Sequence, residues 1–138
     1  MQTKEQREAE SLQAIGKGAH DAVVGLVENL RRASSEPLGS GYEAVDEAEQ
    51  AIHEDPLSIQ YRKGWYSPGE ENDAATEYEI LLSTGGPATR IVGGINRYGE
   101  PESATIEAQD WFQPWTEYGG EQDEDALLEY ARHFIYVP

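Results

Sequence analysis

A glycine-rich stretch in the middle of the chain, STGGPATR at residues 83–90, has the residue types of a loop that cradles phosphate. A Walker-type loop requires a lysine followed by serine or threonine after its second glycine, and this stretch has neither. A dinucleotide-binding loop opens a helix, whereas Ile91 and Val92 continue the pattern of a strand. Pro87 also has no backbone N–H to donate to an anion. The stretch is therefore predicted to be a hairpin turn.

The glycines of this region are expected to serve the backbone. Gly85 and Gly86 are predicted to supply positive φ angles in the turn, where residues with a Cβ are strained. Gly93 and Gly94 lie inside the strand pattern that follows. Glycine at such positions marks a bulge or the close approach of another group, such as an aromatic ring.

The three histidines form no recognisable catalytic or metal-binding pattern. No two have the spacing of an HxxxH motif, the chain has no cysteine, and no GxSxG elbow is present. Carboxylates are too numerous for any pair to be singled out as acid and base. We predict that His20, His53 and His133 lie on helix surfaces, and we expect no catalytic residue, metal or cofactor. A small hydrolase or metal-dependent enzyme stays an alternative, because His53 adjoins Glu54 and Asp55.

The charge of the chain is strongly negative. Its 138 residues include 27 Asp plus Glu and 10 Lys plus Arg, which gives a formal net charge of -17 and a pI near 4.3. Such a surface repels nucleic acid and anionic membranes and attracts basic partners. The simpler alternative is that the charge serves solubility alone.

The acids form three clusters that are spread over the whole chain, and not one acidic tail. Folded carboxylates one or two helical turns apart lie at roughly 5–11 Å, a spacing that can meet lysines and arginines that normally grip phosphates. The clusters therefore predict a site for a basic protein partner, without direct binding of nucleic acid. The candidate partner-binding residues are Glu43, Asp46, Glu47, Glu49, Glu54, Asp55, Glu70, Glu71, Asp73, Glu121, Asp123, Glu124 and Asp125.

Aromatic residues are dense in DWFQPWTEY, residues 110–118, which holds Trp111, Phe112, Trp115 and Tyr118. We predict a corner of the core in which these rings seal a sheet against the last helix. Stacking on nucleobases is the alternative, which the neighbouring acids and the overall charge disfavour.

The first 56 residues are predicted to form an acidic helical subdomain. Leu12, Ile15, Ala19, Ala22, Leu26 and Leu30 recur at helical spacing, widened by Val23 and Val27. Glycines at 16, 18 and 25 weaken this helix, so it either depends on packing or breaks near Gly16. A second helix is expected from about Tyr42 to Glu54. The two helices form a hairpin that is packed beside the rest of the chain or loosely linked to it.

Residues 57–138 are predicted to form an antiparallel sheet with a C-terminal helix. Four segments alternate as strands do, the first placing Leu57, Ile59, Tyr61 and Trp65 on one side. Short turns between strands favour a meander. Acids in EQDED, residues 121–125, suit the start of the final helix. The predicted fold class is α+β, with an N-terminal helical hairpin and a four-stranded antiparallel sheet covered by the last helix.

Nothing in the sequence points to a membrane or an oxidising compartment. There is no apolar run of membrane-spanning length, no apolar signal region at the charged N-terminus and no disulfide. We expect a cytoplasmic protein.

Several segments over about residues 52–138 carry a family resemblance: EDPLSIQYRKGWYSPGE, EYEILLSTGGPATRIVG, GEPESATIEAQDWFQPWTEY and LLEYARHFIY. They resemble a family of small acidic proteins from phages and integrated mobile elements of Pseudomonas-like bacteria, which includes anti-CRISPR proteins that act on type I systems. Several type I inhibitors mimic DNA on the Cascade surveillance complex. The resemblance implies a bacterial host cell and an inhibitory role, and it transfers no functional residue.

The expectation from charge and resemblance together is an anti-CRISPR protein without catalytic activity. It would bind a basic surface of a type I Cascade subunit through its carboxylates and block target DNA. The alternative is a mobile-element protein that binds a host factor without DNA mimicry, with its acids serving solubility.

Overall fold

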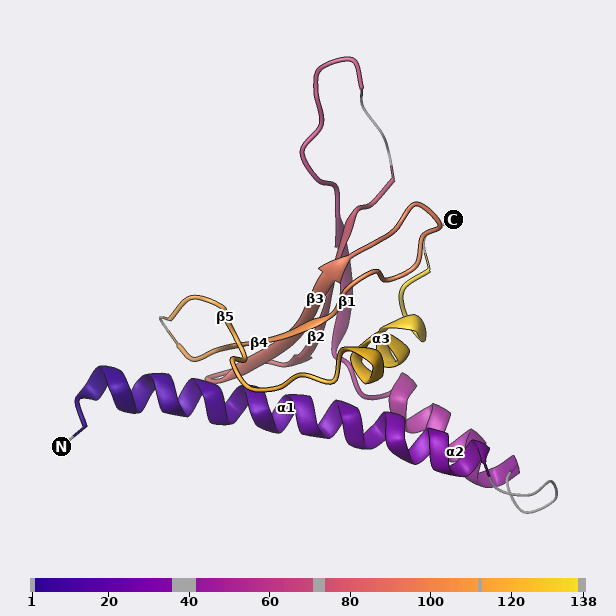
Figure 1. The fold of residues 1–138 in the computed structure, drawn as a ribbon, viewed down its shortest axis with the longest axis horizontal. Helices are drawn as coiled ribbons and strands as arrows, with labels where there is room; N and C mark the ends of the chain where they lie inside the picture. Colours follow the sequence, from indigo (N-terminus) through magenta and orange to yellow (C-terminus); the bar gives the residue numbers. More distant parts are fainter. Residues whose placement is uncertain (1, 36–41, 71–73, 112, 137–138) are drawn as a thin grey trace.

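The computed structural model describes residues 2–35, 42–70, 74–111 and 113–136. It is α+β, with three helices and five strands over these residues (Figure 1). The elements in chain order are α1 (Lys4–Ser34), α2 (Tyr42–His53), β1 (Ser58–Arg62), β2 (Glu77–Ser83), β3 (Ala88–Gly94), β4 (Thr105–Gln109), β5 (Thr116–Glu117) and α3 (Glu124–Arg132).

Helix α1 runs unbroken for 31 residues, so the expected alternative of a break near Gly16 is wrong. A capping box starts the helix, because the Gln6 backbone N–H donates to Thr3 Oγ1 and the Thr3 N–H donates to Gln6 Oε1. Gly16 faces inward, where a Cβ would lie 3.0 Å from the Tyr118 Cβ in a tight contact.

The buried stripe of α1 agrees with the predicted one at Leu12, Val23 and Val27 and differs from it at Ala22. The buried positions are Leu12, Gly16, His20, Val23 and Val27, whereas Ala22, expected on this stripe, is exposed. The prediction followed the apolar side chains and passed over a glycine and a histidine that have partners elsewhere in the fold.

The five strands form an antiparallel meander in the order β1-β2-β3-β4-β5. The predicted meander is confirmed, and the predicted strand number is one too low because β5 comes from the aromatic segment. The register aligns Ile59, Ile80, Ile91 and Ile106 in one row across β1 to β4. Because strand side chains alternate between faces, this row defines an apolar face.

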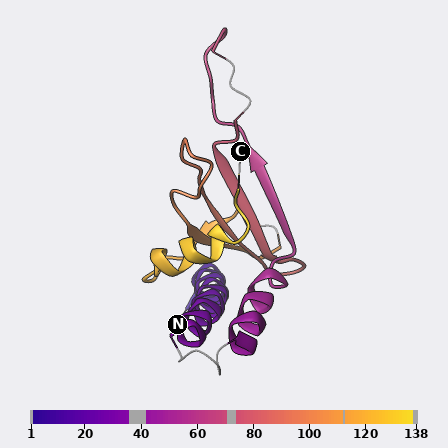
Figure 2. The same ribbon diagram turned by 90° about the vertical axis from the view of Figure 1, so that its right-hand side faces the viewer.

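The helices pack against the isoleucine face and share one core with it (Figures 1 and 2). The core includes Val23 of α1 and Ile52 of α2 together with Leu127 and Tyr130 of α3. The covering layer is therefore wider than the C-terminal helix alone. Secondary structure changes from helix to strand near residue 56, and the core contains residues from both sides of that point.

The connection between β1 and β2 projects from the body of the protein as a long arm (Figure 1). Trp65 lies on this arm and is fully exposed, and Tyr66 next to it is exposed as well. The prediction that Trp65 lies in a strand, on the same side as Ile59 and Tyr61, is wrong, because β1 ends at Arg62.

The turn between β2 and β3 confirms the hairpin prediction, with different tasks for its glycines. Gly85 has φ of +113°, while Gly86 is not in the positive-φ region. Gly86 instead lies under Trp111, because a Cβ there would come within 2.8 Å of the indole ring. At Gly93 a Cβ would lie 1.9 Å from the Ser103 carbonyl oxygen and 2.8 Å from the Tyr78 hydroxyl, which confirms the predicted close approach.

Candidate functional site

The clearest acidic surface is the exposed side of α2. Glu43, Asp46, Glu47 and Glu49 are exposed, while Ala48 and Ile52 on the opposite side are buried. Residues three and four positions apart share a helix face, so these carboxylates lie about one turn from their neighbours. No lysine or arginine occurs between residues 33 and 61, and the only basic residue type in the segment is His53 in the last turn of α2.

The carboxylates of α2 take part in no ion pair within the described part of the chain. Basic side chains pair with acids elsewhere: Lys4 with Glu8, Lys17 with Asp21, Arg31 with Glu129, Arg62 with Glu77, and Arg90 with Glu79 and Glu107. The negative charge of α2 is consequently left to solvent or to a partner.

The two acids that follow α2 are held within the fold. The Gln50 amide donates to Glu54 Oε1 at 2.7 Å. The buried Tyr130 hydroxyl donates to Asp55 Oδ2 at 2.7 Å. Burial, and to a smaller extent the bond to Asp55, raise the pKa of Tyr130 far above its ordinary value, so the hydroxyl stays protonated and remains a donor. Asp55 therefore holds the connection between α2 and β1 against α3. Its Oδ2 is occupied by the Tyr130 hydroxyl, so a partner would have to contact the rest of the carboxylate.

The acids before α3 divide between a structural and a surface position. Asp123 caps α3, because its Oδ1 accepts from the Ala126 backbone N–H at 3.1 Å. Glu121, Glu124 and Asp125 are exposed. Acids in the first turn of a helix also interact favourably with its dipole, which gives Glu124 and Asp125 a stabilising role within the chain.

The three predicted clusters do not form one continuous surface. Glu70 lies on the projecting arm. The arm and α2 lie at opposite ends of the sheet (Figure 1). Glu71 and Asp73 lie outside the described residues. The α2 cluster and the cluster before α3 both belong to the helical side, where α1 contacts both helices.

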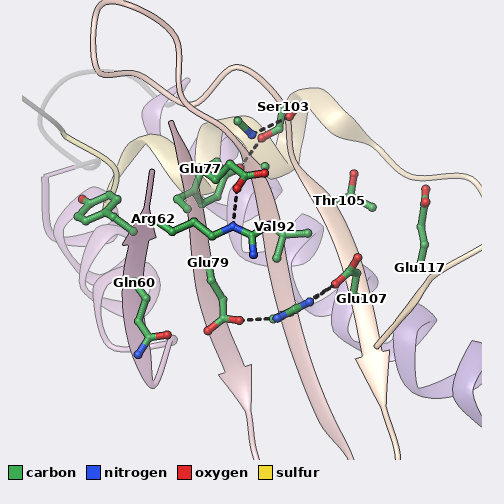
Figure 3. Close-up of a pocket in the computed structure, with 14 residues that line it drawn as sticks. Gln60, Arg62, Glu77, Glu79, Val92, Ser103, Thr105, Glu107 and Glu117 are labelled. Atoms are coloured by element: carbon green, nitrogen blue, oxygen red, sulfur yellow. Dashed lines mark hydrogen bonds and ion pairs between the residues drawn. The ribbon is translucent and has the colours of Figure 1, made fainter. Parts of the chain in front are cut away.

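The face of the sheet opposite the helices holds a charged hollow that sequence reasoning missed. It has a volume of about 520 Å³ and is lined by side chains of β1 to β5 (Figure 3). Arg90 lies between two carboxylates, its Nη1 at 2.6 Å from Glu79 Oε2 and its Nε at 2.8 Å from Glu107 Oε1. The Trp115 ring covers the guanidinium, with Arg90 Cζ 4.1 Å from the ring centroid.

This hollow presents more acid than base. Arg90 is saturated by its partners, and Arg62 pairs with Glu77, whose pKa is lowered chiefly by the hydrogen bond from Arg62. Glu117 completes the lining on β5. Because both arginines are already paired, the hollow lacks a free cation for an anionic ligand. The sequence signal was present as the alternation of Glu77 and Glu79 with buried residues.

The aromatic segment does not seal the sheet against α3. Of its described members, Trp111 is exposed beside the β2–β3 turn and Trp115 lies on the open face above Arg90. Tyr118 faces the helical side, where it packs on α1, with its ring 5.7 Å from that of His20. The predicted corner was wrong because β5 interrupts the segment and turns its rings to different sides.

The histidines are not uniformly on the surface. His20 is buried, and its Nε2 accepts from the Asp123 backbone N–H at 2.9 Å while Nδ1 lies 3.0 Å from Asp21 Oδ1. His53 and His133 contact each other with ring centroids 5.4 Å apart. Among the described residues, no three histidine or carboxylate side chains are grouped so that they could hold a metal ion.

Comparisons with protein-family models, curated proteins and solved structures returned no match for the chain. No helix in the described part is both long and apolar enough to cross a membrane. The class that the fold and site support is therefore a small acidic α+β protein with a one-sided helical layer. The resemblance to mobile-element proteins stays a prediction.

Proposed function

We propose that the protein is a non-catalytic binding protein that presents the carboxylates of α2 to a basic surface and occupies the place of nucleic acid there. The observation that carries the proposal is the row of exposed acids on α2, with no lysine or arginine between residues 33 and 61. Lysines and arginines that grip a duplex meet about one phosphate charge per 1.7 Å of axis. A rigid helix can offer several carboxylates to the same groups without an ordering cost.

A type I Cascade complex is the partner that we propose to test first, with the protein acting as an anti-CRISPR inhibitor of target DNA binding. Support comes from the acidic surface and from the resemblance to mobile-element proteins. The alternative is binding of a host factor without mimicry, and the exposed Trp65 and Tyr66 on the arm favour it, because exposed aromatic side chains are typical anchors at protein interfaces.

The test is a mobility-shift titration of purified type I Cascade on its target duplex, at rising concentrations of the protein. We expect DNA binding to fall and the inhibition to weaken steeply between low and moderate salt, because charge pairing is screened. A variant with Glu43→Gln, Asp46→Asn and Glu47→Gln should inhibit at least about tenfold less well, since close charge pairs across an interface contribute more than about 1 kcal/mol each.

A matched control removes three exposed acids away from α2. Glu5→Gln, Glu100→Gln and Glu102→Gln change the net charge equally, and all three residues are exposed. The control should inhibit like the parent protein. Equal losses in both variants would indicate a general charge effect. Binding to Cascade without any loss of DNA binding would refute mimicry, and absence of binding would refute Cascade as the partner.

A further inference from the structure

Strand β1 forms an open edge of the sheet. It pairs with β2 on one side, and in the described structure no strand lies beyond it (Figure 2). The other edge is formed by β5, which has two residues. An edge strand exposes unpaired backbone N–H and C=O groups that can pair with another chain. At five residues, β1 is long enough to offer a short ladder of such groups.

This edge lacks the features by which proteins usually block strand addition. Inward charges, prolines, bulges or lysines along the edge are the common devices. The sequence of β1 is SIQYR, in which the only charge, Arg62, pairs with Glu77 across the strand pair. Leu57 and Tyr61 are 57% and 45% exposed at this edge. In a chain of net charge -17, residues 56–69 contain no carboxylate at all.

We propose that β1 pairs antiparallel with β1 of a second copy, about a two-fold axis near Gln60, so that two sheets join into one. Gln60 is the midpoint of the strand, and a centre there gives the longest ladder. The pairing preserves faces, because side chains opposite each other in a ladder point to the same side. Ile59 of one copy then lies opposite Tyr61 of the other on the helical side, an apolar pair.

Charge decides in favour of the antiparallel direction and of an identical partner. Acids precede the strand at Glu54 and Asp55, and bases end it at Arg62 and Lys63. Antiparallel pairing about Gln60 brings the start of each strand beside the end of the other, so Arg62 and Lys63 of one copy lie opposite Ser58 and Leu57 of its partner, on the side of the strand where that copy's acids Glu54 and Asp55 precede it. Parallel pairing would place like charges together, which is destabilising. The strand is thus complementary to itself, independently of any role of α2.

The first experiment is sedimentation equilibrium of the full chain over roughly 1–500 µM, the range suited to a small interface. We expect the apparent mass to rise from that of the 15.3 kDa monomer toward twice that value. A variant with Ser58→Lys and Gln60→Lys, both at exposed positions, puts like charges opposite each other, because residue 58 faces Arg62 of the other copy and residue 60 faces itself, and should weaken the dimer at least about tenfold. The matched control, Ser11→Lys with Thr84→Lys at exposed sites elsewhere, should dimerise normally.

The second experiment uses the absence of cysteine. Gln60→Cys should form a disulfide-linked dimer under mild oxidation, because a residue on the axis lies opposite itself, within reach of a disulfide. Thr84→Cys should not. Circular dichroism and the melting temperature check that each variant folds. A monomeric parent protein over the whole range, or a dimer unaffected by the β1 substitutions, would overturn the proposal.

Discussion

Removing the positive charge at the centre of the open sheet face should destabilise the fold measurably. Arg90 bridges Glu79 and Glu107, and the three side chains are only 22%, 26% and 21% exposed. Arg90→Met keeps most of the aliphatic bulk and leaves two carboxylates without their shared cation. A hydrogen bond to a charged group contributes about 1.5–3 kcal/mol, and the contact with Trp115 adds about 0.5–1 kcal/mol. After a reduction for solvent screening, we expect a loss of about 2–4 kcal/mol.

The assay is urea unfolding at neutral pH followed by circular dichroism, with the melting temperature expected to fall by roughly 10 °C. The informative comparison is Arg90→Met combined with Glu79→Gln and Glu107→Gln. Neutral amides remove the repulsion and the cost of unpaired charge, so this triple variant should recover about half of the loss. A loss below about 1 kcal/mol, or a triple variant no more stable than Arg90→Met, would refute the reasoning that the bridge stabilises the sheet.

Two further predictions concern a glycine and a histidine. Gly93→Ala should lower the free energy of unfolding in urea by at least about 3 kcal/mol or abolish folding, because the new Cβ would lie 1.9 Å from a backbone oxygen. Gly94→Ala, whose nearest contact is 3.6 Å, should lower it by no more than about 1 kcal/mol. Similar losses in both variants would contradict the packing argument. Burial, and then the neighbouring His53, lower the pKa of His133 in the folded protein. As pH falls through the ordinary value of 6.5, the unfolded chain therefore binds a proton before the folded protein does, and the free energy of unfolding decreases. Urea unfolding at pH 5.5 and 7.5 should show a smaller pH dependence for His133→Gln than for the parent, and an unchanged slope would exclude His133 as the cause.

The sheet was largely predictable because its signal is local. In β2, Tyr78 and Ile80 alternate with Glu77 and Glu79, and that alternation sets which side chains face the core. The same holds for α2, whose apolar residues recur at helical spacing and whose bounds agree with the expected ones to within a residue.

The face of α1 was not predictable because its determinants lie far along the chain. Gly16 is buried by Tyr118, and His20 is buried because its ring accepts from the backbone of Asp123. Hydropathy counts a glycine as weak and a histidine as polar, so the predicted stripe includes the exposed Ala22 and omits Gly16 and His20, although its members Leu12, Val23 and Val27 are buried. A partner that satisfies a polar group can be recognised only once the chain is folded.

The candidate site was predictable in part, for a similar reason. Exposure of the α2 acids follows from composition and helical period alone. The separation of Glu70 from α2, and the internal bonds of Asp55 and Asp123, depend on the tertiary arrangement. The Arg90 bridge was missed because its two acids come from different strands, and only the register of β2, β3 and β4 brings them together.

The distribution of charge between the two exposed N-terminal helices argues against solubility as the whole purpose of the acids. Helix α1 contains five acids and five bases and is formally neutral, whereas α2 contains four acids and no lysine or arginine. A charge selected for solubility alone needs no such polarity between neighbouring helices. The low cost of exchanging one exposed acid for lysine makes the absence of lysine and arginine from residues 33–61 informative. If the acids of α2 are to attract the lysines and arginines of a partner, they must not be neutralised by lysines or arginines of the same helix, and α2 has none.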